Sequence, residues 1–237
     1  MRFDILTLFP DFFNSPLSTS LISKAIKKGI VEVSLHDIRE DGLGRHKQVD
    51  DRPFGGGPGM VLKADVLEKS LKRSIKTAKK QGAGGKPYII LLDPTGQRLD
   101  QELARDLAKR QWLVLICGHY EGVDERFKEL FVDKEVSIGD YVLSGGETAA
   151  LVLIDATTRL IPGFLGKEES VLFESFSKIK LDGKEATLLD YPVFTRPEIF
   201  AGRKVPEILL TGNHTKIKKW RIEKALEKTK RNRPDLI

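Results

Sequence analysis

The chain has 237 residues, 40% of them apolar, and a formal net charge of +6. This composition excludes low-complexity disorder, collagen repeats and a small disulfide scaffold, and the length favours one large domain or two unequal ones. The single cysteine, Cys117, allows no internal disulfide, and the four histidines show no zinc-ligand spacing. Asp4 interrupts the segment where a signal peptide would be apolar, and no apolar run is long enough to span a membrane. We therefore expect a cytoplasmic protein.

The charge is distributed unevenly along the chain. Residues 61–92 carry eight basic and two acidic side chains, whereas residues 93–163 carry eight basic and thirteen acidic ones. The last 22 residues carry nine basic and three acidic side chains. Basic segments on either side of an acidic body favour a polyanionic partner, although the pattern is equally compatible with solvated helix faces.

Hydrophobic periodicity predicts alternating strands and helices over the first two thirds of the chain. In chain order, the predicted elements are strand 2–8, helix 19–28, strand 31–35, helix 64–78, strand 88–92, helix 99–107, strand 112–117, helix 124–130 and helix 149–161. This alternation predicts an α/β fold whose central strands are buried on both faces, as in a parallel sheet.

The periodicity weakens after Pro162 and Gly163, which end the last of these helices. Residues 163–190 mix isolated apolar residues with Glu, Ser, Lys and Gly, so we expect an interdomain linker there. Residues 191–237 are predicted to form a small helical domain that closes with a basic helix over residues 216–230. The predicted organisation is therefore a domain over 1–162, a linker and a C-terminal helical domain.

Neither of the common nucleotide-binding motifs is present, because no Gly-x-Gly-x-x-Gly occurs and no Gly-Lys is followed by Ser or Thr. Instead, three glycine-containing loops follow apolar segments, at residues 93–96, 118–122 and 137–147. Loops at the carboxyl ends of strands line ligand sites in α/β sheets, and glycine lets backbone groups approach a ligand closely. Each loop alone is more simply explained as a tight turn, but the three together favour a pocket.

Residues 49–60 form the most unusual segment, since four glycines and two prolines in this run allow neither a helix nor a central strand. Arg45, His46 and Arg52 add basic groups on its amino-terminal side. We expect a backbone concavity that holds phosphates or a splayed base. A flexible linker is the alternative, which the paired aspartates and Phe54 disfavour.

Five segments carry a family likeness: residues 50–60 (DDRPFGGGPGM), 117–126 (CGHYEGVDER), 137–147 (SIGDYVLSGGE), 190–198 (DYPVFTRPE) and 212–214 (GNH). Together they resemble bacterial tRNA (guanine-N1)-methyltransferases of the SPOUT superfamily. The likeness runs from the first strand to the terminal helix, with the segments in the family's order.

The resemblance implies a SPOUT-type α/β knot, which is a deep trefoil, followed by a small C-terminal α-helical domain. It implies an obligate homodimer with active sites at the subunit interface, and S-adenosylmethionine as the cofactor bound in the knot. The implied substrate is tRNA, methylated at N1 of guanosine 37, immediately 3′ of the anticodon. Neither a membrane nor DNA is an expected partner.

The resemblance also assigns roles to individual residues. Cofactor contacts are expected from Leu92, Pro94, Gly118, Tyr120, Glu121, Ser137, Ile138, Gly139, Asp140, Tyr141, Val142, Leu143, Gly145 and Gly146. Contacts to tRNA are expected from Arg45, His46, Asp50, Arg52, Gly55, Gly56, Gly57, Pro58, Gly59, Ser170, Lys218, Lys219 and Arg221. Glu121 is a candidate magnesium ligand or, equally, a loop carboxylate that fixes a turn.

Arg159 and Glu174 are the expected catalytic residues. Arg159 matches the family's catalytic arginine, with a plain ion pair to Asp155 as the alternative. Glu174 stands where the family usually has an aspartate base, and His119 and Asp93 replace a common arginine and serine. Guanine N1 is protonated at neutral pH, so a carboxylate base and a guanidinium beside O6 suit the reaction.

Two alternatives stay open. One is a SPOUT methyltransferase that acts on another base or on a ribose hydroxyl. The glycine-rich loop, residues 49–60, and the pair of Arg159 and Glu174 disfavour ribose chemistry. The other is a non-catalytic RNA-binding module on the same scaffold, and only the departure at Glu174 favours it.

Overall fold

The computed structural model describes residues 1–165, 174–181 and 183–237. The chain forms two compact units, Met1–Gly166 and Lys167–Ile237. The boundary between them falls inside the segment 163–190, for which the sequence predicts a linker. Ser170, one of the expected tRNA contacts, lies outside the described residues.

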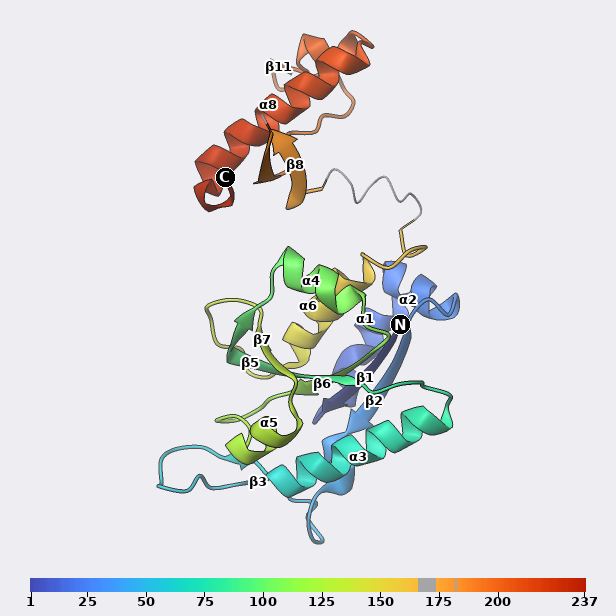
Figure 1. The fold of residues 1–237 in the computed structure, drawn as a ribbon, viewed down its shortest axis with the longest axis vertical. Helices are drawn as coiled ribbons and strands as arrows, with labels where there is room; N and C mark the ends of the chain where they lie inside the picture. Colours follow the sequence, from blue (N-terminus) through green and yellow to red (C-terminus); the bar gives the residue numbers. More distant parts are fainter. Residues whose placement is uncertain (166–173, 182) are drawn as a thin grey trace. The chain divides into compact units, whose positions relative to one another are not determined.

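The first unit is built on a five-stranded sheet (Figure 1). Its strands are β1 (Arg2–Thr7), β2 (Glu32–Asp37), β5 (Tyr88–Arg98), β6 (Trp112–Cys117) and β7 (Lys134–Ser137). Their order across the sheet is β2-β1-β6-β5-β7, and every pair of neighbours is parallel. The α/β fold with a parallel central sheet is therefore confirmed.

Helices cover both faces of this sheet (Figure 1). They are α1 (Asn14–Ser18), α2 (Ser20–Lys27), α3 (Ala64–Lys80), α4 (Gln101–Ala108), α5 (Glu125–Phe131) and α6 (Glu147–Thr158). Apolar residues of α2, α4 and α6 join one core cluster, and those of α3 and α5 join the other. Successive side chains of a strand point to opposite faces, so Phe3 and Ile5 enter the first cluster while Leu6 enters the second. This two-sided cover explains why β1 and β6 are wholly buried.

Short connecting elements complete the first unit. They are the 3-10 turns Pro10–Phe13 and Ile38–Asp41 and the small antiparallel pair β3 (Asp50–Asp51) and β4 (Val61–Leu62). Two helices of this unit begin at aspartate caps, because Asp100 accepts a hydrogen bond from Leu103 N at 2.8 Å and Asp124 accepts one from Arg126 N at 3.0 Å.

The strands at one edge differ from the sequence prediction. β5 continues through the predicted loop 93–96, since its pairing with β7 shifts register after Leu92 and resumes at Gln97. β7 itself was not predicted, because its sequence Lys-Glu-Val-Ser at the sheet edge has little of the apolar character of a buried strand. The irregular stretch of β5 matters because it forms one wall of the cavity described below.

The second unit is not purely helical. Among its described residues, 174–181 and 183–237, the long helix is α8 (His214–Asn232), capped by Asn213, and the other elements are two antiparallel hairpins and the 3-10 turns Glu207–Leu210 and Pro234–Leu236. The hairpins are β8 (Ser177–Leu181) with β9 (Lys184–Leu188), and β10 (Ile199–Phe200) with β11 (Arg203–Lys204). The first hairpin lies within residues 163–190, for which the sequence predicts an interdomain linker. The chain after this hairpin is tied to α8 by a hydrogen bond from Leu189 N to Thr229 Oγ1 at 2.9 Å.

Candidate functional site

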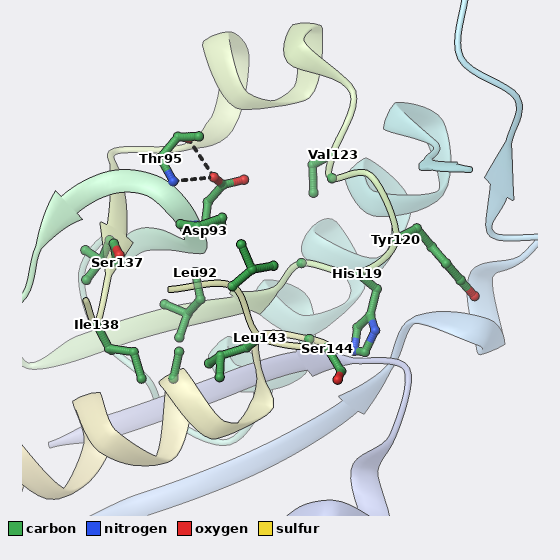
Figure 2. Close-up of a pocket in the computed structure, with 18 of the residues that line it drawn as sticks. Leu92, Asp93, Thr95, His119, Tyr120, Val123, Ser137, Ile138, Leu143 and Ser144 are labelled. Atoms are coloured by element: carbon green, nitrogen blue, oxygen red, sulfur yellow. Dashed lines mark hydrogen bonds between the residues drawn. The ribbon is translucent and has the colours of Figure 1, made fainter. Parts of the chain in front are cut away.

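A cavity of about 330 Å³ opens at the carboxyl ends of β5, β6 and β7. Figure 2 shows the segments that follow these strands converging on it, with Leu92, Ile138 and Leu143 among the apolar side chains of the wall. All of the predicted cofactor residues line this cavity except Asp140, which is exposed beside it. The irregular stretch of β5 and the loops after β6 and β7 are distant in sequence and meet at this one site.

Backbone packing fixes the shape of the cavity. Gly146 N donates to Gly118 O at 2.9 Å, which joins the loop after β6 to the start of α6. A Cβ at Gly146 would lie 2.7 Å from Cys117 Cα, so only glycine permits this approach. Ser137 Oγ bonds with both Gly139 N, at 3.2 Å, and Gly139 O, at 3.0 Å, and so closes the turn after β7.

Charged side chains on one side of the cavity form ion pairs with one another. Asp93 accepts hydrogen bonds from Thr95 N at 2.9 Å and Thr95 Oγ1 at 2.6 Å (Figure 2), and its carboxylate lies 3.7 Å from Lys128 Nζ. Burial opposes its ionisation, but these contacts outweigh burial and hold the pKa of the Asp93 carboxyl below its usual value. Lys128 also lies 3.1 Å from Glu135 and 3.5 Å from Glu125. These carboxylates raise the pKa of Lys128 although burial works against its charge.

A second polar group lies at the start of α6. The Glu147 carboxylate is 4% exposed and accepts hydrogen bonds from Thr7 Oγ1 at 2.6 Å and from His119 Nε2 at 2.8 Å. Cys117 lies nearby, and burial together with the Glu147 charge raises the pKa of its thiol well above the usual value. Cys117 is therefore held as an inert, protonated thiol rather than a nucleophile.

The glycine-rich loop is anchored to the cavity loop that follows β6. Glu121 N donates to Met60 O at 2.9 Å, and Leu62 N donates to Gly122 O at 3.0 Å. Gly59 lies so close to Glu121 that a Cβ there would be 2.3 Å from its Oε1. The tip of the loop is open, because Phe54 is 98% exposed and Cβ atoms at Gly55, Gly56 and Gly57 would meet no other atom within 4 Å. The structure thus brings the base of the glycine-rich loop, which is expected to contact tRNA, beside a loop that is expected to contact the cofactor.

The two expected catalytic residues do not line this cavity. Arg159 is the half-buried residue at the carboxyl end of α6, whereas the cavity lies at the amino end of the same helix. Glu174 belongs to the second unit, where it borders a cavity of about 580 Å³ between the β8–β9 hairpin and α8. The expected tRNA contacts Lys218, Lys219 and Arg221 are exposed on α8, and the Arg221 guanidinium stacks 4.8 Å above the ring of Tyr191.

The remaining expected tRNA contacts belong to the first unit. Arg45 and His46 are exposed on the turn that precedes β3, Arg52 is exposed at the start of the glycine-rich loop that follows β3, and Asp50 is half-buried in β3. Sequence reasoning missed the charged wall formed by Lys128 and its partners, and it gave no role to Glu147. A signal was present for Glu147, since it closes the segment 137–147 that carries the family likeness.

A family model described as tRNA (Guanine-1)-methyltransferase TrmD matches residues 1–237. The chain belongs to the tRNA (guanine-1)-methyltransferase family. The likeness seen in the sequence is thereby confirmed over the whole chain. Members of this family are methyltransferases, and the protein is accordingly an enzyme that transfers a methyl group from a donor.

Curated relatives in this tRNA (guanine-1)-methyltransferase family match the whole of this chain over most of their own length. The tRNA (guanine-N(1)-)-methyltransferase of Geobacter sulfurreducens is 49% identical over 237 residues, which are 100% of this chain and 91% of the relative. The enzyme of the same name from Moorella thermoacetica is 48% identical, with 100% and 90% covered. That of Endomicrobium trichonymphae is 46% identical, with 100% and 99% covered.

Within residues 1–165, 174–181 and 183–237, none of the helices combines the length and the apolar character that crossing a membrane requires. In the same part of the chain, no three side chains of the types His, Cys, Asp and Glu gather as they would around a metal ion.

Proposed function

We propose that the protein transfers the methyl group of S-adenosylmethionine to N1 of guanosine 37 in tRNA, immediately 3′ of the anticodon. The proposal rests mainly on one observation, which is that the cavity and the glycine-rich loop lie next to each other in the first unit. The cavity that the three loops form and the glycine-rich loop expected to hold tRNA are joined by backbone hydrogen bonds at Glu121 and Gly122. Since tRNA is a cytoplasmic molecule, we place the enzyme in the cytoplasm.

The cavity suits S-adenosylmethionine in size and in charge. Its volume of about 330 Å³ lies within the range of about 300–1,000 Å³ found for small-molecule sites. Leu92, Ile138 and Leu143 offer apolar surface for an adenine ring, and glycine backbone groups offer hydrogen bonds. The carboxylates of Asp93, Glu121 and Glu125 exceed the single cation of Lys128 on its walls, which favours a cationic ligand. When bound, the cofactor supplies an electrophilic methyl group on a sulfonium.

The position of Arg159 supports a homodimer with shared active sites. α6 has 12 residues, so its two ends are about 18 Å apart at 1.5 Å per residue. Within one chain Arg159 is therefore too far from the cavity to act on a base held beside the cofactor. An Arg159 from a second subunit would meet that requirement, and Val142, 85% exposed on a cavity loop, offers apolar surface to such a partner.

In the proposed reaction two side chains act on the guanine base. Glu174 accepts the N1 proton as N1 attacks, which is the task of a general base. Arg159 donates hydrogen bonds to O6, where negative charge builds during the transfer, and a single donor of this kind contributes roughly 3 kcal/mol. A base in the second unit links the chemistry to the unit whose helix α8 we assign to tRNA binding. Such an arrangement favours reaction only with the correct substrate bound.

Two further parts of the proposal concern the fold and metal ions. We assign the SPOUT-type trefoil knot to residues 1–162 and the role of a tRNA-binding domain to residues 191–237, with family membership and the parallel sheet as support. We retain Glu121, which lines the cavity, as the candidate magnesium ligand.

Identification of the methylated nucleoside tests the proposal. The protein is incubated with S-adenosylmethionine and with tRNA transcripts that carry G or A at position 37, and the products are digested and identified. We expect N1-methylguanosine from the G transcript alone. Methylation of the A transcript, a ribose-methylated product, or cofactor binding without transfer would each overturn the proposal.

A further inference from the structure

Glu147 is a buried carboxylate that the proposed reaction does not use. It is the first residue of α6, where the unpaired backbone N–H groups of the helix end favour a negative charge. Burial raises the pKa of a carboxyl, but the hydrogen bonds from His119 and Thr7 outweigh burial here and lower the pKa of Glu147. Glu147 is therefore ionised at neutral pH although only 4% of its surface is exposed.

The charge on Glu147 fixes the state of the His119 ring. An ionised carboxylate only accepts hydrogen bonds, so His119 Nε2, which is 2.8 Å and 2.9 Å from the two carboxylate oxygens, must carry a proton and donate it. A bond shared between two oxygens of a charged group is stronger than a neutral one and leaves the ring little freedom to turn.

Packing holds the same ring from two other sides. The ring of Phe9 meets it edge-on at 5.2 Å between centroids. On another side the backbone of Gly145 lies so close that a Cβ there would be 2.1 Å from His119 Cε1. His119 and Ser144, the residue before Gly145, both line the cavity (Figure 2). The ring is thus fixed between Glu147, Phe9 and the loop that ends in Gly145.

His119 and its neighbours also form part of the cavity wall. His119 and Gly145 both line the cavity, and His119 precedes Tyr120 and Glu121 in the same loop. Tyr120 is held at a φ of +60°, an uncommon conformation for a residue other than glycine. A shift of the His119 ring would therefore move both Gly145 and the loop that carries Tyr120.

We propose that Glu147 is a positioning residue for the methyl donor, which acts by locking His119 against Gly145 and so fixing two walls of the cavity. Thr7, at the carboxyl end of β1, is the anchor that ties this group to the central sheet. The inference rests on the proposed function, because it takes the ligand of the cavity to be S-adenosylmethionine.

A buried carboxylate elsewhere in the same sheet provides a matched control. Asp4 of β1 is 0% exposed and accepts hydrogen bonds from Arg2, from His36 Nε2 at 2.7 Å and from Trp112 Nε1 at 2.7 Å, but it does not line the cavity. Glu147→Gln and Asp4→Asn make the same chemical change in the same kind of network. They differ in contact with the cavity wall, and this difference separates a positioning role from a purely structural one.

Calorimetric titration of the full chain with S-adenosylmethionine tests the inference, together with the thermal unfolding midpoint of each variant. We expect both variants to lower the midpoint, because each weakens a buried network. Only Glu147→Gln should raise the Kd for S-adenosylmethionine, by about ten-fold, because it loses a charge-assisted hydrogen bond. The Kd of Asp4→Asn should stay within about two-fold of the parent value. Equal Kd values for the two folded variants would overturn the inference, and no binding by the parent would overturn the proposed function instead.

Steady-state kinetics and a second pair of variants keep the inference testable if Glu147→Gln folds poorly. Thr7→Val keeps the shape of its side chain but loses the donor, so KM for S-adenosylmethionine should rise about three-fold while kcat changes less. His119→Arg supplies a permanent donor to Glu147 and should bind more tightly than His119→Leu. Equal binding by the two His119 variants, or a Thr7→Val change confined to kcat, would also overturn the inference.

Discussion

The two units of the chain hold their charged side chains in different ways. Around the cavity of the first unit, Glu147 is buried in a hydrogen-bonded network and Lys128 is surrounded by three carboxylates. On α8 of the second unit, Lys218, Lys219 and Arg221 are exposed to solvent. Buried, paired charges define a shape, whereas exposed charges attract a partner from a distance and are screened by salt.

From this difference we expect the two units to have separate tasks. A small ligand that enters the first unit is recognised by geometry, so its affinity should depend little on ionic strength. A polyanion bound along α8 is held mainly by charge, so its affinity should fall steeply as salt is added. The predictions below test this division, beginning with the change for which we expect the largest effect.

Glu174→Gln is the strongest test, because it places a step of the chemistry in the second unit. Removal of a general base lowers turnover by about 10²–10⁴-fold. We expect this loss in kcat for tRNA methylation, with the affinity for S-adenosylmethionine unchanged. Glu227→Gln on α8, whose carboxylate pairs with Lys224 at 2.8 Å, is the matched control and should keep its turnover. Turnover of Glu174→Gln close to that of the parent would remove this residue from the reaction.

Asp4→Asn tests whether the buried charges of the first unit support its fold. Burial raises the pKa of the Asp4 carboxyl, but the hydrogen bonds from His36, Arg2 and Trp112 outweigh burial and lower it. A carboxyl whose pKa is lowered on folding stabilises the folded state at pH values above its unfolded-state pKa. This stability is lost as the pH falls through the folded-state pKa, below about 4. The variant should lose about 3 kcal/mol in free energy of unfolding at pH 7.

Urea unfolding at pH 7 and at pH values below 4 measures this effect. The parent protein should lose stability more steeply on acidification than Asp4→Asn, since the variant lacks the group that is protonated. Asp11→Asn changes an exposed carboxylate of the same unit and serves as the control. A variant as stable as the parent at pH 7 would show that the Asp4 network adds nothing to the fold.

The sequence predicted the parts of the fold that depend on continuous apolar segments. β1 and β6 were predicted because they are buried on both faces and therefore apolar throughout. β7 was missed because Lys134 and Glu135 occupy half of a four-residue edge strand. The continuation of β5 was missed because Pro94 and Gly96 are typical of a turn, while the pairing that extends the strand is made with a distant segment.

The candidate site was predictable to a similar extent. The three cavity loops were found from their glycines and from the family likeness, since both are local features of the sequence. The Glu147 group was not found, because its partner Thr7 lies 140 positions away and only the folded sheet brings the two together. The hairpin of β8 and β9 was missed although a local signal was present, since Lys-Ile-Lys-Leu and Glu-Ala-Thr-Leu both alternate polar and apolar residues and an Asp-Gly pair separates the two strands.

Gly146→Ala tests whether the cavity is defined by geometry. A Cβ at this position would lie 2.7 Å from Cys117 Cα and 2.9 Å from Gly118 N, and these backbone atoms cannot move without shifting the cavity loop. We expect the Kd for S-adenosylmethionine to rise by about ten-fold or more, equivalent to about 1.4 kcal/mol. Gly84→Ala, where a Cβ meets nothing within 4 Å, is the control. Unchanged binding by Gly146→Ala in calorimetric titration would contradict a close-packed site.

Lys218→Ala tests whether the exposed cations of α8 bind tRNA through their charge. We expect it to have the smallest effect of the four changes. Loss of one phosphate contact reduces the slope of log Kd for tRNA against log salt concentration by about 0.7–0.9. The affinity at a single salt concentration should change by less than about ten-fold, because several exposed cations of α8 share the interaction. Lys109→Ala removes a lysine of the first unit that is 74% exposed and pairs with Asp106 at 2.7 Å, and it should leave the slope unchanged. Equal slopes for Lys218→Ala and the parent in filter-binding titrations would show that tRNA does not contact α8 at Lys218.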